Sequence, residues 1–204
     1  MTTATQKRAI CQACLRPASA CICQWVTPIA TDVEVLIFQH PLEVANPKGT
    51  ARLLHMSLPR SRLVTGEVFD ESLFAGGRHV LLYPDTPQAG LPAVQSLSPA
   101  DVADTNSLCL VVIDGTWRKS LKMLHLNPAL QKMPRLSLKD LPASNYRIRK
   151  ARLLHQLSTL EATCAALAQL EGDGGKFQPL LDAFDGFISE QVARFHQSIQ
   201  TDEG

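Results

Sequence analysis

The amino-acid sequence predicts an α/β domain that carries a small cysteine-rich segment at its N-terminus. Three short apolar runs have the near-continuous hydrophobic character of parallel strands that are covered on both faces. Helical patterns lie between and after these runs, an alternation that is typical of α/β domains. Four of the six cysteines lie within 13 residues near the start of the chain.

The predicted strands cover residues 32–38, 79–83 and 108–113. Polar or proline residues follow each strand: Gln39-His40-Pro41 after the first, Pro84-Asp85 after the second, and Asp114-Gly115-Thr116-Trp117 after the third. Ligands of open α/β sheets gather at the carboxyl ends of the strands. We therefore expect the functional site at these three ends.

Helices are predicted at residues 50–58, 117–126, 153–170 and 180–199. The last two of these helices each have apolar residues along one face at helical spacing, and the linker at residues 171–176 separates them. The length of 204 residues favours one main domain with a small appendage. We assign residues 1–28 to the cysteine-rich segment and residues 29–204 to the main domain.

The composition excludes several classes of protein. Hydrophobic residues make up 45% and charged residues 19%, which argues against wholesale disorder. No apolar run approaches the roughly 20 residues that cross a bilayer, and the polar start lacks the apolar core of a secretory signal. Walker A, G-x-G-x-x-G and G-x-S-x-G motifs are missing from the sequence. We expect a soluble cytoplasmic protein with no membrane partner.

The net charge of +1 hides an uneven distribution. Residues 117–152 contain ten Lys or Arg and a single acid, Asp140, whereas acidic residues dominate from Glu161 onward. Clustered basic residues favour a polyanionic partner, because they release counterions from phosphates. The sequence therefore predicts nucleic-acid binding; the alternative is that these charges are only solvated helix faces.

The cysteine cluster follows the pattern C-x2-C-x6-C-x-C and consists of Cys11, Cys14, Cys21 and Cys23. Four thiolates at this spacing can surround one tetrahedral Zn²⁺ ion. Disulfide pairing is the alternative, although the cytosol keeps such thiols reduced. Cys109 and Cys164 lie in apolar stretches and are predicted to be core residues.

Asp114 is the sharpest candidate for chemistry. A carboxylate at a strand end can accept a proton from a substrate, with Trp117 as a stacking wall. The alternatives are that Asp114 caps the following helix and that Trp117 packs into the core. His40, at the end of the first predicted strand, is the best-placed histidine.

Several motifs in order resemble the DTW-domain family, the tRNA-uridine aminocarboxypropyltransferases. They are C-x2-C-L-R-P with a following C-x-C, H-P-x-E, V-V-I-D-G-T-W, and S-T-x-E-A at residues 158–162. The resemblance extends from Cys11 to Ala162. It implies a SPOUT-like α/β catalytic domain whose C-terminal knot forms a pocket for S-adenosylmethionine. The cysteine spacing adds a small N-terminal zinc-binding knob to this domain.

The resemblance also implies a reaction. The 3-amino-3-carboxypropyl group of S-adenosylmethionine would move to N3 of a tRNA uridine, methylthioadenosine would leave, and Asp114 would act as the base. We expect no protein partner. The alternatives are an S-adenosylmethionine-dependent RNA methyltransferase and a non-catalytic, zinc-containing RNA-binding module.

The remaining site residues follow from the same resemblance and from the charge pattern. The donor site is predicted to include Tyr83, Pro84, Thr116, Trp117, Ser158, Thr159 and Glu161. Glu161 has an alternative role as a structural helix residue. RNA contacts are predicted for His40, Arg118, Lys119, Arg147, Arg149 and Lys150.

Overall fold

The fold is built around a parallel β-sheet. The computed structural model describes residues 9–84, 92–102, 104–105, 107–136, 138 and 157–202, and only the backbone of 195–202. Within these ranges six strands form the sheet: β1 (Glu34–Gln39), β2 (Ser61–Thr65), β3 (Arg78–Leu82), β4 (Ser96–Leu97), β5 (Leu108–Asp114) and β6 (Arg135–Leu136). Their order is β2-β1-β5-β3-β6-β4, and every neighbouring pair is parallel. All the carboxyl ends therefore lie at one edge.

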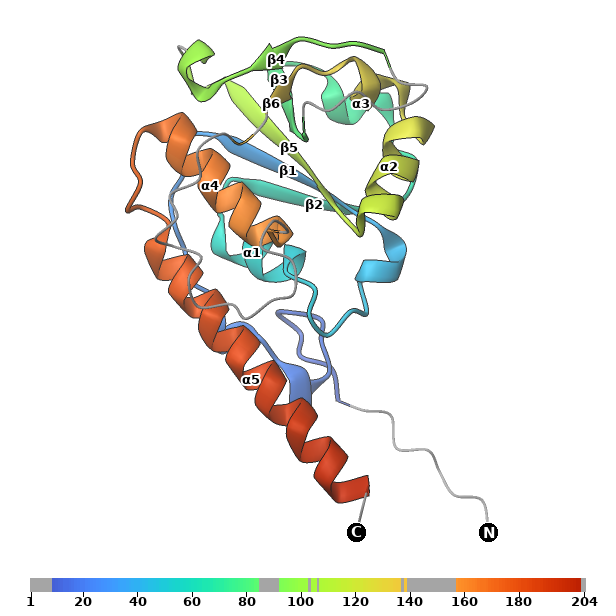
Figure 1. Ribbon diagram of the computed structural model, residues 1–204, viewed down its shortest axis with the longest axis vertical. Helices are drawn as coiled ribbons and strands as arrows, with labels where there is room; N and C mark the ends of the chain where they lie inside the picture. The colour runs from blue at the N-terminus through green and yellow to red at the C-terminus, as the bar shows by residue number, and fades with distance from the viewer. Residues whose placement is uncertain are drawn as a thin grey trace.

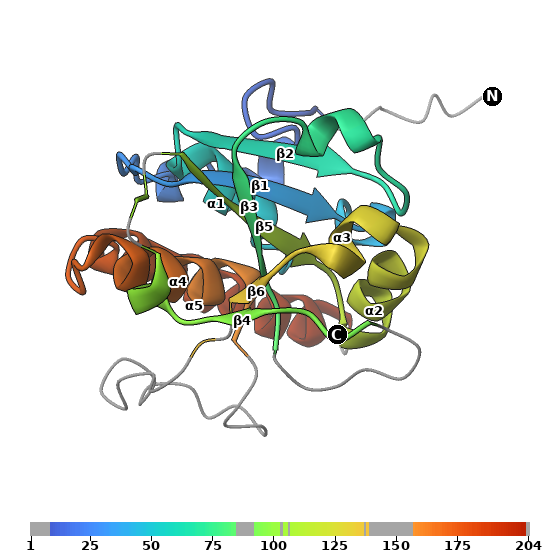
Figure 2. The same cartoon turned by 90° about the horizontal axis from the view of Figure 1, so that it is seen from above.

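Helices cover both faces of the sheet. The described residues contain α1 (Ala51–Ser57), α2 (Trp117–Leu126), α3 (Pro128–Lys132), α4 (Thr159–Glu171) and α5 (Gln178–Asp202), besides short 3₁₀ turns. Helices α1, α4 and α5 lie on one side, and α2 and α3 lie on the other (Figures 1 and 2). The result is a three-layer α/β/α arrangement, which confirms the predicted α/β class.

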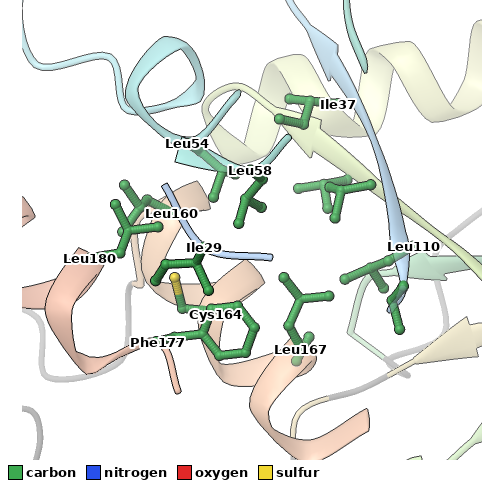
Figure 3. Close-up of a cluster of buried hydrophobic side chains, with 14 of the residues drawn as sticks. Ile29, Ile37, Leu54, Leu58, Leu110, Leu160, Cys164, Leu167, Phe177 and Leu180 are labelled. Atoms are coloured by element: carbon green, nitrogen blue, oxygen red, sulfur yellow. The ribbon is translucent and has the colours of Figure 1, made fainter. Parts of the chain in front are cut away.

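The strands alternate their side chains between two apolar clusters. Val35, Ile37, Leu110 and Val112 face α4 and α5, whereas Leu36, Phe38, Val111 and Ile113 face α2 and α3. Figure 3 shows the first cluster, which includes Ile37 of β1, Leu110 of β5 and Leu167 of α4. Continuing the alternation to the strand ends directs the side chains of Gln39 and Asp114 to the α4 side.

The N-terminal cysteine-rich segment lies against α5 (Figure 1). Cys14 and Ile22 are buried in the same cluster as the sheet residues. Trp25 Nε1 donates a hydrogen bond of 2.9 Å to Glu190 on α5. The segment therefore shares the core of the main domain, and the proposed boundary at residue 28 stays a prediction.

The three predicted strands correspond to β1, β3 and β5 within two residues at each end. Sequence reasoning missed β2, whose residues are only partly buried, and the two-residue strands β4 and β6. The helix predicted for residues 153–170 includes residues 157 and 158, and for these two the prediction is wrong. They are not helical, because Ser158 is the N-cap of α4, which begins at Thr159.

Two further expectations concern topology and membranes. The knot that the resemblance implies stays a prediction, and residues 137 and 139–156, between β6 and α4, lie outside the described residues. In the described part of the chain, no helix combines the length and apolar character needed to span a membrane. Cys109 and Cys164 are buried, as predicted.

Candidate active site and metal centre

Asp114, the predicted catalytic carboxylate, lies at the carboxyl end of β5 and is 6% exposed. Its Oδ2 accepts a hydrogen bond of 3.0 Å from Gln39 Nε2, and its Oδ1 accepts one of 2.7 Å from Thr159 Oγ1. Gln39 is the register partner of Asp114 on β1, and Thr159 begins α4. Two elements that are distant in the sequence thus converge on one carboxylate.

Burial raises the pKa of Asp114 above its ordinary value. The hydrogen bonds from Thr159 and Gln39 act in the opposite direction but do not outweigh burial. A raised pKa makes the ionised carboxylate a better proton acceptor near neutral pH. The alternative role of Asp114 as a helix cap is wrong. The N-cap of α2 is Thr116, and both oxygens of Asp114 are bonded elsewhere.

His40 lies beside Asp114, but its imidazole is buried. Nδ1 accepts a hydrogen bond from the Leu42 N–H at 3.1 Å, so Nε2 carries the proton and donates to Glu67 Oε1 at 2.7 Å. Lys122 donates to the other oxygen of Glu67 at 2.7 Å and lowers the pKa of that carboxyl group. These bonds join the turn after β1, the loop after β2 and α2. An RNA contact by His40 stays a prediction.

Lys119 forms an ion pair with Glu43, with 2.7 Å between Nζ and Oε1. Burial raises the pKa of Glu43, but the hydrogen bonds from Lys119 and Asn46, together with the nearby positive charge, leave the pKa below its ordinary value. Arg118, the preceding residue, is exposed. The ion pair of Lys119 therefore links α2 to the turn after β1, whereas the Arg118 side chain is exposed to solvent.

Trp117 and Tyr83 form a stacked pair at the same edge. Their ring centroids are 5.2 Å apart, with 20° between the ring planes. Tyr83 is buried, and burial raises its pKa, whereas the Trp117 side chain is 48% exposed. The Arg135 guanidinium lies over the Tyr83 ring. Trp117 is therefore not a core residue, and it presents an aromatic surface three residues from Asp114.

Ser158 and Glu161 form a capping box at the start of α4. Glu161 Oε2 accepts hydrogen bonds from the Ser158 N–H at 2.8 Å and from Ser158 Oγ at 2.6 Å. Glu161 thus has the structural role that its sequence context left open. Ser158 also borders a cleft of about 260 Å³, whose other lining residues are Lys48, Thr50, Phe184, Ile188, Gln191 and Val192.

The structure gathers most of the predicted site residues at one edge of the sheet. Thr116 and Pro84 are exposed there. Arg147, Arg149 and Lys150 lie outside the described residues. Sequence reasoning missed Gln39 and Glu67; for Gln39 the available signal is its place directly before His40 at a strand end.

The four predicted metal ligands lie together in the N-terminal segment. The sulfur atoms of Cys11 and Cys23 are 3.7 Å apart, those of Cys14 and Cys21 are 3.8 Å apart, and all four lie within 4.8 Å of one another. Tetrahedral Zn–S bonds of about 2.3 Å separate the sulfur atoms by about 3.8 Å. The cysteines are free thiols, so the disulfide alternative is not realised. The geometry fits one tetrahedral metal ion.

The chain is similar in sequence to several known proteins. The chain is 27% identical over 198 residues to the mouse protein named tRNA-uridine aminocarboxypropyltransferase 2, covering 92% of this chain and 65% of the mouse protein. It is 29% identical to the fly protein of that name over 81% of this chain and 68% of that protein. It is 28% identical to tRNA-uridine aminocarboxypropyltransferase A of Arabidopsis thaliana over 59% and 52% of the two chains.

The chain thus spans less than two thirds of the mouse relative, and no solved structure matches it significantly. The profile of the DTW domain matches residues 8–192, which include the cysteine cluster, the strand ends and α4. This chain belongs to the DTW-domain family.

Proposed function

We propose that this protein transfers the 3-amino-3-carboxypropyl group of S-adenosylmethionine to N3 of a uridine in tRNA. The observation that carries the proposal is a buried carboxylate, Asp114, in the D-G-T-W motif of a DTW-domain chain. The names of the mouse, fly and plant relatives support the same reaction class and the same kind of substrate.

In this reaction Asp114 acts as the general base. It takes the N3 proton of the uridine while N3 attacks the methylene carbon beside the sulfonium. The N3–C bond forms, the C–S bond breaks, and the electron pair of the broken bond stays on the sulfur of methylthioadenosine. The raised pKa of Asp114 supports this role, because a more basic carboxylate accepts the proton more readily.

The donor site in our proposal lies around Trp117, Tyr83 and the start of α4. The exposed Trp117 ring and its stack on Tyr83 support this placement, since they offer a flat apolar surface close to Asp114. Thr116, Pro84, Ser158 and Thr159 complete the proposed donor site, and Glu161 supports it through the capping box at the start of α4. The SPOUT-like knot is part of the same proposal, because the knot would form the walls of that pocket.

We propose that tRNA binds along the basic side chains at this edge. Arg118 is exposed beside the aromatic pair, which supports a phosphate contact there. Arg147, Arg149 and Lys150, which lie outside the described residues, are further proposed contacts on the strength of the charge pattern alone. Positive charge close to the reacting base positions the RNA without reading its sequence.

The metal in our proposal is a structural Zn²⁺ ion held by Cys11, Cys14, Cys21 and Cys23. Zinc held by four thiolates has no open coordination position for a substrate. The ion would therefore hold the N-terminal segment in shape and take no part in the group transfer.

The test is to incubate the purified protein with S-adenosylmethionine and unmodified tRNA. We expect methylthioadenosine to be released and the tRNA to gain 3-(3-amino-3-carboxypropyl)uridine, both measured by mass spectrometry. Asp114→Asn should lower kcat by a factor on the order of 10² to 10⁴, because the amide cannot accept the proton. The control Asp182→Asn changes an exposed carboxylate on α5 and should keep the wild-type rate.

Other products would contradict the proposal in distinct ways. Accumulation of S-adenosylhomocysteine would identify a methyltransferase. RNA binding without either product would identify a non-catalytic binding module. Transfer at the full rate by Asp114→Asn would leave the reaction intact and remove Asp114 from the role of base.

A further inference from the structure

The Asp114 carboxylate receives one hydrogen-bond donor on each oxygen, from two different layers of the fold. Gln39 reaches Oδ2 from the neighbouring strand, and Thr159 reaches Oδ1 from the first residue of α4. Gln39 and Asp114 are both nearly fully buried. An ionised carboxylate only accepts hydrogen bonds, so the amide nitrogen of Gln39, and not its oxygen, must face Asp114.

Two donors constrain a carboxylate more than one does. A single hydrogen bond leaves the group free to rotate about its Cβ–Cγ bond, whereas donors on both oxygens fix the plane of the group. Each oxygen has about two acceptor positions, and within the described part of the chain Gln39 and Thr159 fill one on each, which leaves one on each for a substrate proton. The donors themselves have little freedom, because Gln39 ends a central strand and Thr159 lies in a capped first turn.

We propose that Gln39 and Thr159 are positioning residues that together hold the Asp114 carboxylate in the orientation needed to take the proton from its substrate. This inference rests on the proposed role of Asp114 as the base. It gives Gln39 a role that the sequence motifs do not suggest, and it gives Thr159 a role separate from donor binding.

Other charged groups face the same carboxylate. Glu43, from the turn after β1, raises the pKa of Asp114, and Lys119 of α2 lowers it. The two groups carry opposite charges and form an ion pair at 2.7 Å, so their effects on the pKa of Asp114 partly cancel. Glu161 of α4 is engaged by Ser158, and His40 by Glu67. Substitutions at Gln39 or Thr159 leave all four groups in place.

The first part of the test removes each donor at nearly constant shape. Gln39→Met and Thr159→Val should each lower kcat by a factor on the order of 10 to 100, because a misoriented base reacts less often. Loss of either hydrogen bond also raises the pKa of Asp114, so the rising limb of kcat/KM should move to higher pH. Thr159→Ser, which keeps the hydroxyl, should recover most of the rate lost in Thr159→Val.

The second part uses Gln39→Glu, which gives a distinctive pH response. While the new carboxyl group at position 39 holds a proton, it can donate to Asp114 as the amide did. As the pH rises, that proton is lost and two carboxylates face each other, so activity should fall where the wild type stays active. The control Gln131→Glu adds the same charge on α3, where the side chain bonds the His125 carbonyl, and should keep the wild-type profile.

A measurement without substrates separates the two proposals. Carbon-13 NMR titration of Asp114 in the free protein should show a higher pKa in Gln39→Met than in the wild type. An inactive wild type with this shift would overturn the proposed function and support the arrangement of donors. An active wild type whose Gln39→Met and Thr159→Val variants fold, judged by thermal melting, and keep its rate and pH profile would overturn the positioning role alone.

Discussion

At the scale of single residues, the burial of the Asp114 carboxylate reduces stability once the group is ionised. The carboxylate is shielded from water, and its pKa in the folded chain lies above its value in the unfolded chain. The folded state therefore holds the proton to a higher pH than the unfolded state does. Below both pKa values neither state is ionised and no penalty arises; the penalty develops as the pH rises through the unfolded value and is complete above the folded one.

Asp114→Asn should for this reason stabilise the fold at neutral pH while abolishing most of the activity. We expect a gain of about 0.5–2 kcal/mol, because the buried charge is removed. Gln39 can turn its amide so that its carbonyl oxygen accepts a hydrogen bond from the new amide. Thermal melts of both proteins across a pH series measure the difference.

The pH series supplies its own control. The gain should shrink as the pH falls through the unfolded carboxyl pKa, because wild-type Asp114 is then protonated in both states. A gain of equal size at every pH would mean that the charge of Asp114 does not limit stability. A loss at neutral pH would mean that the hydrogen bonds to the ionised group outweigh its burial.

At the scale of elements, α5 and the cysteine-rich segment fit each other at one glycine. A Cβ atom at Gly186 would overlap the Trp25 ring, with Cη2 only 2.6 Å away. The same turn of α5 supplies Glu190, which accepts hydrogen bonds from Trp25 and Gln24. Arg194, one turn further along, donates to the Ser19 carbonyl. The absence of a side chain at Gly186 lets the segment lie directly on the helix.

Gly186→Ala should destabilise the protein by about 1–3 kcal/mol, since Trp25 must move out of its position. Its matched control is Gly174→Ala, where no atom lies within 4 Å of the new methyl group. In a Trp25→Ala background the overlap is gone, and Gly186→Ala should become stabilising by up to about 1 kcal/mol through helix propensity. Denaturant unfolding of the four proteins of this cycle measures the coupling, and additive effects would contradict direct contact between the two positions.

At the scale of the whole molecule, the candidate metal centre is continuous with the main core. Cys14 is a candidate ligand, and it is buried in the same cluster as residues of β1, β5, α4 and α5. Arg16, two residues on, donates to the Asn46 and Pro47 carbonyls and lies over Phe187 of α5. A change at the metal site therefore reaches the sheet layer through direct packing.

Removing the metal should lower the thermal stability of the whole protein. We expect one Zn²⁺ per chain by elemental mass spectrometry and a fall in Tm of roughly 5–10 °C after chelation. Cys11→Ser should lower the metal content, whereas Cys109→Ala, which removes a buried thiol elsewhere, should keep it. An unchanged Tm after complete loss of metal would show that the thiols pack without an ion.

The sequence by itself determined the features that depend on neighbouring residues. Continuous apolar runs specify strands that are buried on both faces, as in β5. The spacing of the four cysteines specifies a compact sulfur cluster, and an Asp after an apolar strand specifies a carboxylate at the sheet edge. Each of these signals lies within a short stretch of consecutive residues, so the local pattern of the sequence is sufficient to find it.

Only the tertiary structure decided which groups meet. Gln39 and Asp114 are 75 positions apart and become partners through the register of β1 and β5, and Thr159 reaches the same carboxylate from 45 positions away. The fit of Trp25 against Gly186 likewise joins the two ends of the chain. Periodicity tells which face of an element is apolar, but partners across a sheet or between layers follow from strand order, register and close packing. Those are properties of the whole chain, because each contact depends on where all the other elements lie.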